Sequence, residues 1–271
     1  MRRLIIRPGA IGDCILSFPA LEHLAADYTE LWVPSPVVPL IQFADCVRSI
    51  ASTGLDLVGI PEVQMPLNLR ARLQTFDSIV SWYGSKRPEF REALLSMNPN
   101  CEFYPALPQD FTLHATDFYA AQVGAPMGLI PRIRVEDVEQ RDAIVIHPFS
   151  GSKSKNWPLE RFRELAALLP YEVEWLAGPE EDLPQARRFE NLMDVARFLA
   201  GVRLYIGNDS GITHLAAATG VKTVAIFGPR SPQIWAPRGE NVEVIAVKDL
   251  TDLKPGVVAR MVNRLLDSRL T

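Results

Sequence analysis

The sequence predicts an α/β protein built from two doubly wound halves, and three observations support this fold class. Short apolar segments, suited to buried strands, alternate with helical patterns along the 271 residues. Polar or glycine-containing turns follow several of these segments, at the edge where open α/β sheets place their ligands. A stretch rich in proline and glycine at 124–132 separates the two series and is typical of a domain boundary. We therefore predict domains at residues 1–132 and 133–271.

The first half opens with a predicted strand at 3–7, a glycine loop at 9–12 and a helix. The loop lacks the GxGxxG spacing, and no acidic residue ends the next strand at 31–33, so a dinucleotide site is disfavoured. Asp13 directly follows the loop, at the carboxyl end of the first strand. It is therefore a candidate for a ligand site, and the alternative is that it only caps the helix or stabilises its first turn.

The other elements are recognised by hydrophobic periodicity and by the residues that bound them. In the first half, the patterns predict strands at 47–50, 78–82 and 102–104, and helices at 37–43, 68–75, 88–97 and 114–123. In the second half, they predict strands at 142–147, 172–177, 204–206 and 223–227, and helices at 159–169, 212–219 and 255–266. Apart from the interval between the strands at 172–177 and 204–206, strand and helix thus alternate in both halves, as in a doubly wound fold.

A loop rich in serine and lysine, residues 148–156, follows the first strand of the second half. Pro158 suits the first turn of the next helix, so this loop precedes a helix N-terminus. Lys153 and Lys155 are candidates for neutralising a phosphate there, and plain solvation of both lysines is the alternative. An acidic turn at 178–182 follows the next strand, so the polar turns are expected at one edge of the sheet.

The turn predicted at 207–211 is the most informative part of the chain. It carries more polar side chains than a strand-to-helix connection needs, namely those of Asn208, Asp209, Ser210 and Thr213. Gly207 and Gly211 let a ligand approach the backbone closely. Free N–H groups and the positive end of the helix dipole favour an anion at this position. The alternative is that Asp209 or Ser210 only caps the helix.

Composition and charge exclude several other classes of protein. The 28 basic and 32 acidic residues give a net charge of −4, which argues against a broad basic surface for nucleic acid. Three separated cysteines without a CxxC pair favour reduced packing residues over disulfides or a zinc site. The N-terminal apolar run stops at Arg7, too short for a signal peptide or a membrane span. We therefore expect a cytoplasmic protein that binds no nucleic acid.

Three motifs occur in a fixed order along the chain. They are Arg7-Pro-Gly-Ala-Ile-Gly-Asp13, Lys155-Asn-Trp-Pro158, and Asn208-Asp-Ser-Gly-Ile-Thr-His-Leu-Ala-Ala-Ala218 with Phe227-Gly-Pro229. Together they resemble glycosyltransferase family 9, the heptosyltransferases of lipopolysaccharide core assembly, from residue 3 to about residue 237. The resemblance implies a GT-B architecture, in which two Rossmann-like domains face each other across a cleft. The N-terminal domain would bind the acceptor and the C-terminal domain the donor.

The reaction implied by the resemblance is the inverting, metal-independent transfer of a sugar from a nucleoside-diphosphate donor, ADP-heptose in the best-known members. The acceptor would be a lipopolysaccharide-type or other cell-surface glycan or glycolipid, reached by a cytoplasmic protein with peripheral contact at the inner membrane. No cofactor is implied, and the chain has no Asp-x-Asp motif for a metal. The alternatives are a sugar-nucleotide epimerase of GT-B fold and a non-catalytic protein that binds nucleotide sugars.

The resemblance also implies roles for single residues. Asp13 would be the general base that takes a proton from the acceptor hydroxyl. The donor would be bound by Ser150, Lys155, Glu181, Asp209, Ser210, Gly211, Thr213 and His214. Lys155 would stabilise the leaving diphosphate, together with N–H groups at 210–213, and Asp209 would accept hydrogen bonds from sugar hydroxyls. Glu181 would bind the ribose, with Glu180 as the alternative, and His214 either touches phosphate or packs within its helix.

Overall fold

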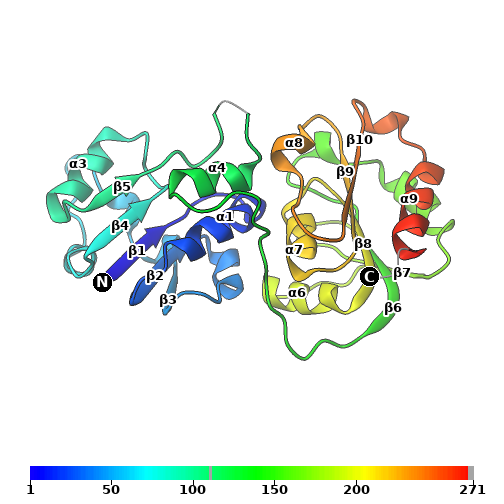
Figure 1. Ribbon diagram of the computed structural model, residues 1–271, viewed down its shortest axis with the longest axis horizontal. Coiled ribbons are helices and arrows are strands. Elements are labelled where there is room, and N and C mark those ends of the chain that lie inside the picture. The colour runs from blue at the N-terminus through cyan, green and yellow to red at the C-terminus, as the bar shows by residue number, and fades with distance from the viewer. Residues whose placement is uncertain (110–111, 268–271) are drawn as a thin grey trace. The chain divides into compact units, whose positions relative to one another are not determined.

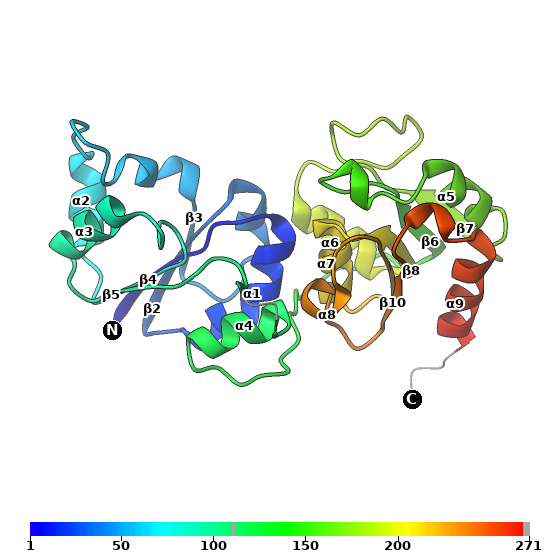
Figure 2. The same ribbon diagram turned by 90° about the horizontal axis from the view of Figure 1, so that it is seen from above.

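The computed structural model describes residues 1–109 and 112–267, and the contacts within it divide the chain into two compact units. The first unit comprises Met1–Phe111 and Ala115–Leu129. The second comprises Thr112–His114 and Ile130–Thr271. Each unit contains one parallel sheet with helices packed around it (Figures 1 and 2).

The first unit is built on a five-stranded sheet in the order β3-β2-β1-β4-β5. Its strands are β1 (Arg2–Ile6), β2 (Tyr28–Val33), β3 (Cys46–Ser49), β4 (Ser78–Ser81) and β5 (Cys101–Phe103). All the pairings between them are parallel. The chain order reverses at β1, which lies between β2 and β4, so the carboxyl end of β1 is the switch point where such sheets place ligands. The loop that leads to Asp13 begins there.

The helices of this unit are α1 (Ile11–His23), α2 (Leu67–Leu73), α3 (Pro88–Met97) and α4 (Ala115–Gln122). In both views α1 lies beside α4 (Figures 1 and 2). Short 3₁₀ helices occur at Ser35–Leu40, Ile50–Ser52 and Leu55–Leu57. The helix expected at 37–43 was wrong in type, since the chain forms the first of these 3₁₀ helices instead. Pro39 lies inside that segment and has no N–H for an α-helical hydrogen bond.

The second unit is also built on a five-stranded sheet, in the order β10-β9-β8-β6-β7. Its strands are β6 (Arg141–His147), β7 (Glu172–Trp175), β8 (Val202–Asn208), β9 (Thr223–Phe227) and β10 (Val242–Ala246). All are paired in parallel. The chain order reverses between β6 and β8, so the ends of these two strands form the switch point of this sheet.

The helices of the second unit are α5 (Leu159–Ala166), α6 (Leu192–Ala200), α7 (Gly211–Thr219), α8 (Pro232–Trp235) and α9 (Pro255–Asp267), with 3₁₀ helices at Lys153–Lys155 and Leu250–Asp252. α6 packs beside α7 (Figure 1), and α5 packs beside α9 (Figure 2). Trp157 is fully buried in the core, where its ring meets Phe162 edge to face with ring centres 4.8 Å apart. Its indole Nε1 donates to the carbonyl oxygen of Leu253 at 3.2 Å. The loop that ends at Trp157 is therefore anchored in the core.

The predicted fold class, α/β with two doubly wound parallel-sheet halves, is confirmed. Three elements of the second unit, namely α6, α8 and β10, were missed by the sequence patterns. β10 is an edge strand of which only Ile245 is buried, so its hydrophobic signal is weak. Among the described residues, no helix has the length and apolar character needed to span a membrane.

Candidate functional site

The turn between β8 and α7 forms the densest polar cluster of the second unit. Ser210 is the N-cap of α7, and its hydroxyl oxygen accepts a hydrogen bond from the Thr213 backbone N–H at 3.3 Å. Thr213 donates its own hydroxyl to the carbonyl oxygen of Asn208 at 2.5 Å and lies 3.1 Å from the hydroxyl of Tyr205. Part of the polarity of this turn therefore stabilises the start of the helix, as a capping residue does.

Asn208 joins the turn to the loop that follows β6. Its buried side chain donates from Nδ2 to the Pro148 carbonyl oxygen at 2.8 Å and accepts at Oδ1 from the Trp157 backbone N–H at 3.0 Å. Both ends of the loop 148–157 are thereby attached to the end of β8. The sequence indicated Asn208 only as one polar group among several, and its role in holding the loop was missed.

Lys155, carried by that loop, lies against Asp209. Its Nζ donates to the backbone carbonyl oxygen of Asp209 at 2.8 Å and to carboxylate Oδ2 at 3.2 Å. The two side chains are 17% and 4% exposed. Lys153, by contrast, is exposed. The structure thus brings two predicted site residues, Lys155 and Asp209, together. Of the two candidate lysines, Lys155 is the one that lies in the polar cluster.

Arg230 brings a second cation to the same carboxylate, and the sequence reading missed it. Its Nε lies 3.8 Å from Asp209 Oδ2, and its guanidinium lies over the Trp235 ring, 4.1 Å from the ring centre. The available signal was its position directly after the Phe227-Gly-Pro229 motif, at the end of a strand next to β8. Asp209 therefore faces two cations beside the positive end of α7.

His214 lies buried in the first turn of α7. Its pKa is lowered to about 3, mainly by burial and in addition by the nearby positive groups His114, Lys155 and Arg230. The imidazole is therefore neutral at physiological pH. Its buried Nδ1 has no hydrogen-bond partner within the described part of the chain. The structure places His214 next to the cluster, while its contact with phosphate stays a prediction.

Glu181 lies in the turn after β7 and is turned toward the end of β6. Its Oε2 accepts from the Gly178 backbone N–H at 2.6 Å and lies 3.0 Å from His147 Nε2. Burial acts to raise the pKa of Glu181, but the hydrogen bonds and the charges of His147 and Arg188 outweigh it, so the pKa is lowered. Glu180 is exposed. Of the two glutamates, Glu181 is thus the one fixed at the sheet edge.

The remaining predicted residues of the donor side have local partners. The Ser150 hydroxyl lies 2.6 Å from Asn156 Oδ1 and 2.9 Å from the Ser152 carbonyl oxygen, inside its own loop. Gly211 is the first residue of α7, where backbone N–H groups have no partner within the helix. Ser150 thus shapes the loop, whereas Gly211 offers a backbone donor. Within the described chain, no group of three His, Cys, Asp or Glu side chains could hold a metal ion.

In the first unit, Asp13 lies in the first turn of α1. Its Oδ2 accepts from the backbone N–H of the N-cap residue Ala10 at 3.4 Å. Gly9 has a φ of +125°, and a Cβ added there would lie 3.6 Å from both Asp13 Oδ2 and Arg7 Nη1. Of the two local roles expected as the alternative, Asp13 therefore has that of the first-turn acid, whereas Ala10 is the N-cap. The Asp13 carboxylate lies at the carboxyl end of β1 in this arrangement.

Arg7 is fully buried beneath this loop. Nη2 donates to the Asp13 carbonyl oxygen at 2.9 Å, Nη1 to that of Pro8 at 2.7 Å, and Nε to the Ser17 hydroxyl at 2.9 Å. The guanidinium also lies 4.5 Å from the centre of the Tyr119 ring. Arg7 therefore fixes the backbone on which Asp13 stands, a role that the sequence did not indicate.

Two other ionisable side chains border the same loop. Burial raises the pKa of Cys14 to about 11, although the charge of Arg7 opposes the increase. Burial likewise raises the pKa of Tyr119 to about 12, again against the effect of Arg7. Both groups stay protonated near neutral pH, so neither supplies a base. The carboxylate of Asp13 is the better candidate for that role.

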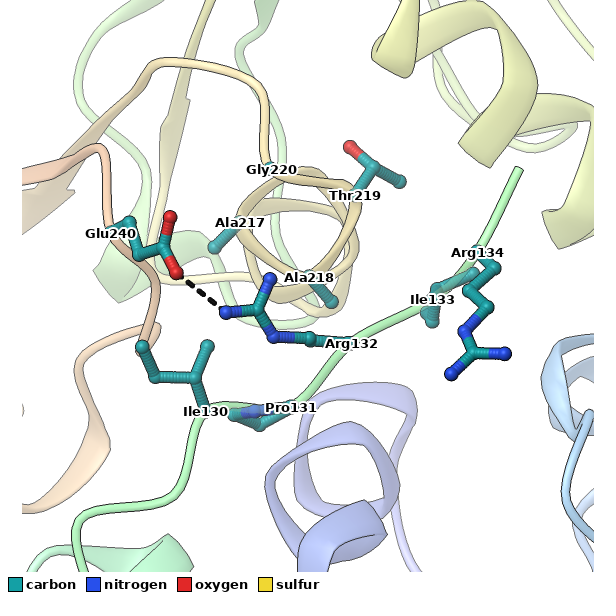
Figure 3. Close-up of a pocket in the computed structure, with 10 residues that line it drawn as sticks. All are labelled: Ile130, Pro131, Arg132, Ile133, Arg134, Ala217, Ala218, Thr219, Gly220 and Glu240. Carbon is teal, nitrogen blue, oxygen red and sulfur yellow. Dashed lines mark hydrogen bonds and ion pairs between the residues drawn. The ribbon is translucent and has the colours of Figure 1, made fainter. Parts of the chain in front are cut away.

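A cavity of about 140 Å³ lies elsewhere in the second unit (Figure 3). It is lined by the segment 130–134, the end of α7 at 217–220, and Glu240, which pairs with Arg132. The Ile133 backbone N–H donates to the Ala218 carbonyl oxygen at 2.9 Å, so the segment is attached to the helix. The cavity therefore borders the C-terminal end of α7, whereas the polar cluster surrounds its N-terminal end.

Comparison with known proteins identifies the family. The sequence profile described as glycosyltransferase family 9 (heptosyltransferase) matches residues 104–255. Lipopolysaccharide heptosyltransferase 1 of Escherichia coli K12 is 32% identical over 116 residues, which is 36% of this chain and 35% of that protein. Lipooligosaccharide heptosyltransferase 2 of Haemophilus influenzae is 23% identical over 307 residues, covering 90% of this chain and 88% of that protein.

A solved structure supports the fold over nearly the whole chain. The structure of E. coli ADP-heptose lps heptosyltransferase II has a TM-score of 0.74 and 19% sequence identity, and covers 98% of both chains. This likeness confirms the GT-B fold class that the sequence predicted. The alignment with the E. coli K12 relative spans only about a third of the length of that protein. The family profile, however, covers more than half of this chain, and the chain therefore belongs to glycosyltransferase family 9, the heptosyltransferase family.

Proposed function

We propose that this protein is an inverting, metal-independent glycosyltransferase that moves heptose from ADP-heptose to a lipopolysaccharide-type or other cell-surface glycan. The observation that carries the proposal is the contact of Lys155 with Asp209 beside the N-terminus of α7. A cation and a helix N-terminus together suit a diphosphate. Family membership and the names of the relatives support this class of donor.

In the proposed donor complex, the second unit binds the nucleotide sugar. Lys155 and the backbone N–H groups of Ser210 and Gly211 contact the diphosphate. The Oδ1 atom of Asp209 accepts no hydrogen bond from a described residue, and in our proposal it accepts one from a hydroxyl of the sugar.

Glu181 binds the ribose through the carboxylate that Gly178 holds at the sheet edge. Ser150, Thr213 and His214 stay predicted contacts of the donor.

The proposed domain roles follow from this assignment. Residues 133–271 bind the donor, and residues 1–132 bind the acceptor and supply the base. We place the protein in the cytoplasm with peripheral contact at the inner membrane, because the proposed acceptor is lipid-linked.

The proposed reaction is a direct displacement. The carboxylate of Asp13 takes the proton of an acceptor hydroxyl, and the hydroxyl oxygen attacks the anomeric carbon of the sugar. The bond from that carbon to the diphosphate oxygen breaks on the opposite face, and its electron pair leaves with ADP. The new glycosidic bond therefore has the inverted configuration. Lys155 and the start of α7 stabilise the negative charge that develops on the diphosphate.

Calorimetric titration with ADP, UDP and GDP tests the donor class. We expect ADP to bind and the other two to bind more weakly, and absence of binding by all three would refute the proposal. Mass analysis of the products of ADP-heptose, with and without a lipopolysaccharide-core acceptor, tests the reaction. Release of nucleotide without an acceptor would indicate an epimerase instead. Binding of ADP-heptose without turnover in either case would indicate a non-catalytic binding protein.

A further inference from the structure

Arg230 has no part in the roles assigned so far, yet it lies beside Asp209 of the polar cluster. It follows β9 directly after the Phe227-Gly-Pro229 motif. Its side chain, 37% exposed, approaches Oδ2 of Asp209 to 3.8 Å. The same carboxylate oxygen lies 3.2 Å from Lys155 Nζ. Two cations thus meet on one buried carboxylate oxygen.

The hydrogen-bond donors of Arg230 are open. A guanidinium carries five N–H donors in a planar fork. Among the described residues, Arg230 makes only the long ion pair with Asp209 and the stacking contact with Trp235, at 4.1 Å from the ring centre. Stacking fixes the plane of the guanidinium without using its N–H groups. The fork is therefore held in place while its N–H groups stay available to a ligand.

The surroundings of Arg230 have an excess of positive charge. Asp209 supplies one negative charge against Lys155 and Arg230, and the N-terminus of α7 adds a partial positive charge. The pKa of His214 is lowered mainly by burial, and the charges of Lys155 and Arg230 add to this effect. Its Nδ1 is also buried without a partner in the described chain. These observations indicate a site for an anion with more than one negative charge.

We propose that Arg230 is a second diphosphate-binding residue, whose guanidinium donates to phosphate oxygens of the nucleotide alongside Lys155. Asp209 holds both cations in position before the diphosphate arrives. The inference rests on the proposed function, because it deepens the assignment of the same donor site. A planar fork can donate to two oxygens at once, and in a diphosphate these can come from both phosphate groups, so Arg230 favours a diphosphate over a monophosphate.

The test compares Arg230→Gln and Arg230→Lys with the wild-type protein by calorimetric titration. The probes are ADP, AMP, adenosine and inorganic pyrophosphate. For Arg230→Gln we expect ADP and pyrophosphate to bind about tenfold to hundredfold more weakly, because the substitution removes a charge-assisted hydrogen bond. The affinity for AMP should fall less, and the affinity for adenosine should not change. The affinity of Arg230→Lys for ADP should lie between those of the wild type and the glutamine variant. Arg163→Gln is the matched control, since Arg163 is an exposed arginine on α5 that pairs with Glu160.

The outcomes separate this inference from the function on which it rests. If the wild type binds ADP and Arg230→Gln binds it equally well, the role of Arg230 is refuted and the donor site stands. The role is also refuted if adenosine loses as much affinity as ADP. If pyrophosphate binds in an Arg230-dependent manner but no nucleoside diphosphate does, the anion site stands and the proposed donor is wrong. If neither pyrophosphate nor any nucleoside diphosphate binds, both are refuted.

Discussion

Arg7 donates a hydrogen bond from Nη2 to the backbone carbonyl oxygen of Asp13 at 2.9 Å, from a fully buried position under the loop. The same guanidinium also donates to Pro8 and Ser17. A buried arginine that bonds to the backbone before a candidate base, to the carbonyl oxygen of that base and to a hydroxyl one turn after it holds the base in one position. Arg7 is thus a positioning residue for Asp13. Its effect on kcat can be separated from its effect on the free energy of unfolding.

We predict that Arg7→Lys lowers the rate of transfer by at least about tenfold while the protein still folds. A lysine keeps the charge but donates from one point, so it does not reach three acceptors at once. The measurements are kcat with ADP-heptose and the free energy of unfolding in urea, which should fall by about 1–3 kcal/mol. Ser17→Ala removes one of the same hydrogen bonds and serves as the control, with a loss of about 1 kcal/mol and nearly unchanged kcat. Wild-type kcat in Arg7→Lys would contradict the positioning role.

Asp13→Asn tests the base itself. The amide keeps the size and an acceptor oxygen at the helix start, but it does not take up a proton from the acceptor hydroxyl. We therefore expect kcat to fall by about 10²–10⁴-fold. Affinity for ADP should stay within about twofold of the wild type, because the proposed donor residues lie in the second unit. Undiminished transfer by Asp13→Asn would show that another group is the base.

The parts of the fold that the sequence predicted are those with strong local signals. β9 is a buried and mostly apolar run bounded by turns. α7 follows a serine cap and is followed by Gly220, whose φ of +87° suits the left-handed end of a helix. β10 has no such signal, because Val242 and Val244 at this edge are only half-buried. α8 is a four-residue helix, too short to show a helical period.

The candidate site was predictable where it depends on strand ends. Lys155 and Asp209 follow β6 and β8, and adjacent parallel strands bring their carboxyl ends together, so their meeting could be expected. The role of Arg7 depends on α4, which supplies Tyr119 from far along the chain. The position of Arg230 depends on a contact nearer in sequence, with Trp235 in α8, and on the distant Asp209. Such tertiary contacts leave no periodic trace in the sequence.

A matched pair of lysines tests the proposed diphosphate site. Lys155→Ala should weaken ADP binding by about tenfold to hundredfold, because it removes a charge that contacts Asp209 and, in our proposal, the diphosphate. Lys153→Ala removes an equal charge from the same loop, but Lys153 is exposed, so ADP affinity should change by less than about twofold. Calorimetric titration of both variants gives the comparison. Equal effects of the two substitutions would mean that only the overall charge of the loop matters.

The buried histidine of α7 gives the protein a predictable dependence on pH. The pKa of His214 is lowered from 6.5 to about 3, mainly by burial and further by the nearby positive groups. Between these two values the unfolded chain binds a proton at this position that the folded chain excludes. Protons therefore stabilise the unfolded state in this window. His214 consequently lowers the stability of the fold as the pH falls below about 6.5.

We predict that the free energy of unfolding decreases by roughly 1.4 kcal/mol per pH unit from this one group as the pH falls from about 6 to about 4. His214→Gln keeps a polar side chain without a titrating ring, so its stability should fall less steeply over the same range. Urea unfolding at pH 7.5, 6.0 and 5.0 measures the two slopes. His23→Gln, which changes an exposed histidine at the end of α1, is the control and should follow the wild-type curve. Parallel curves for the wild type and His214→Gln would mean that His214 takes up its proton in the folded protein as readily as in the unfolded chain.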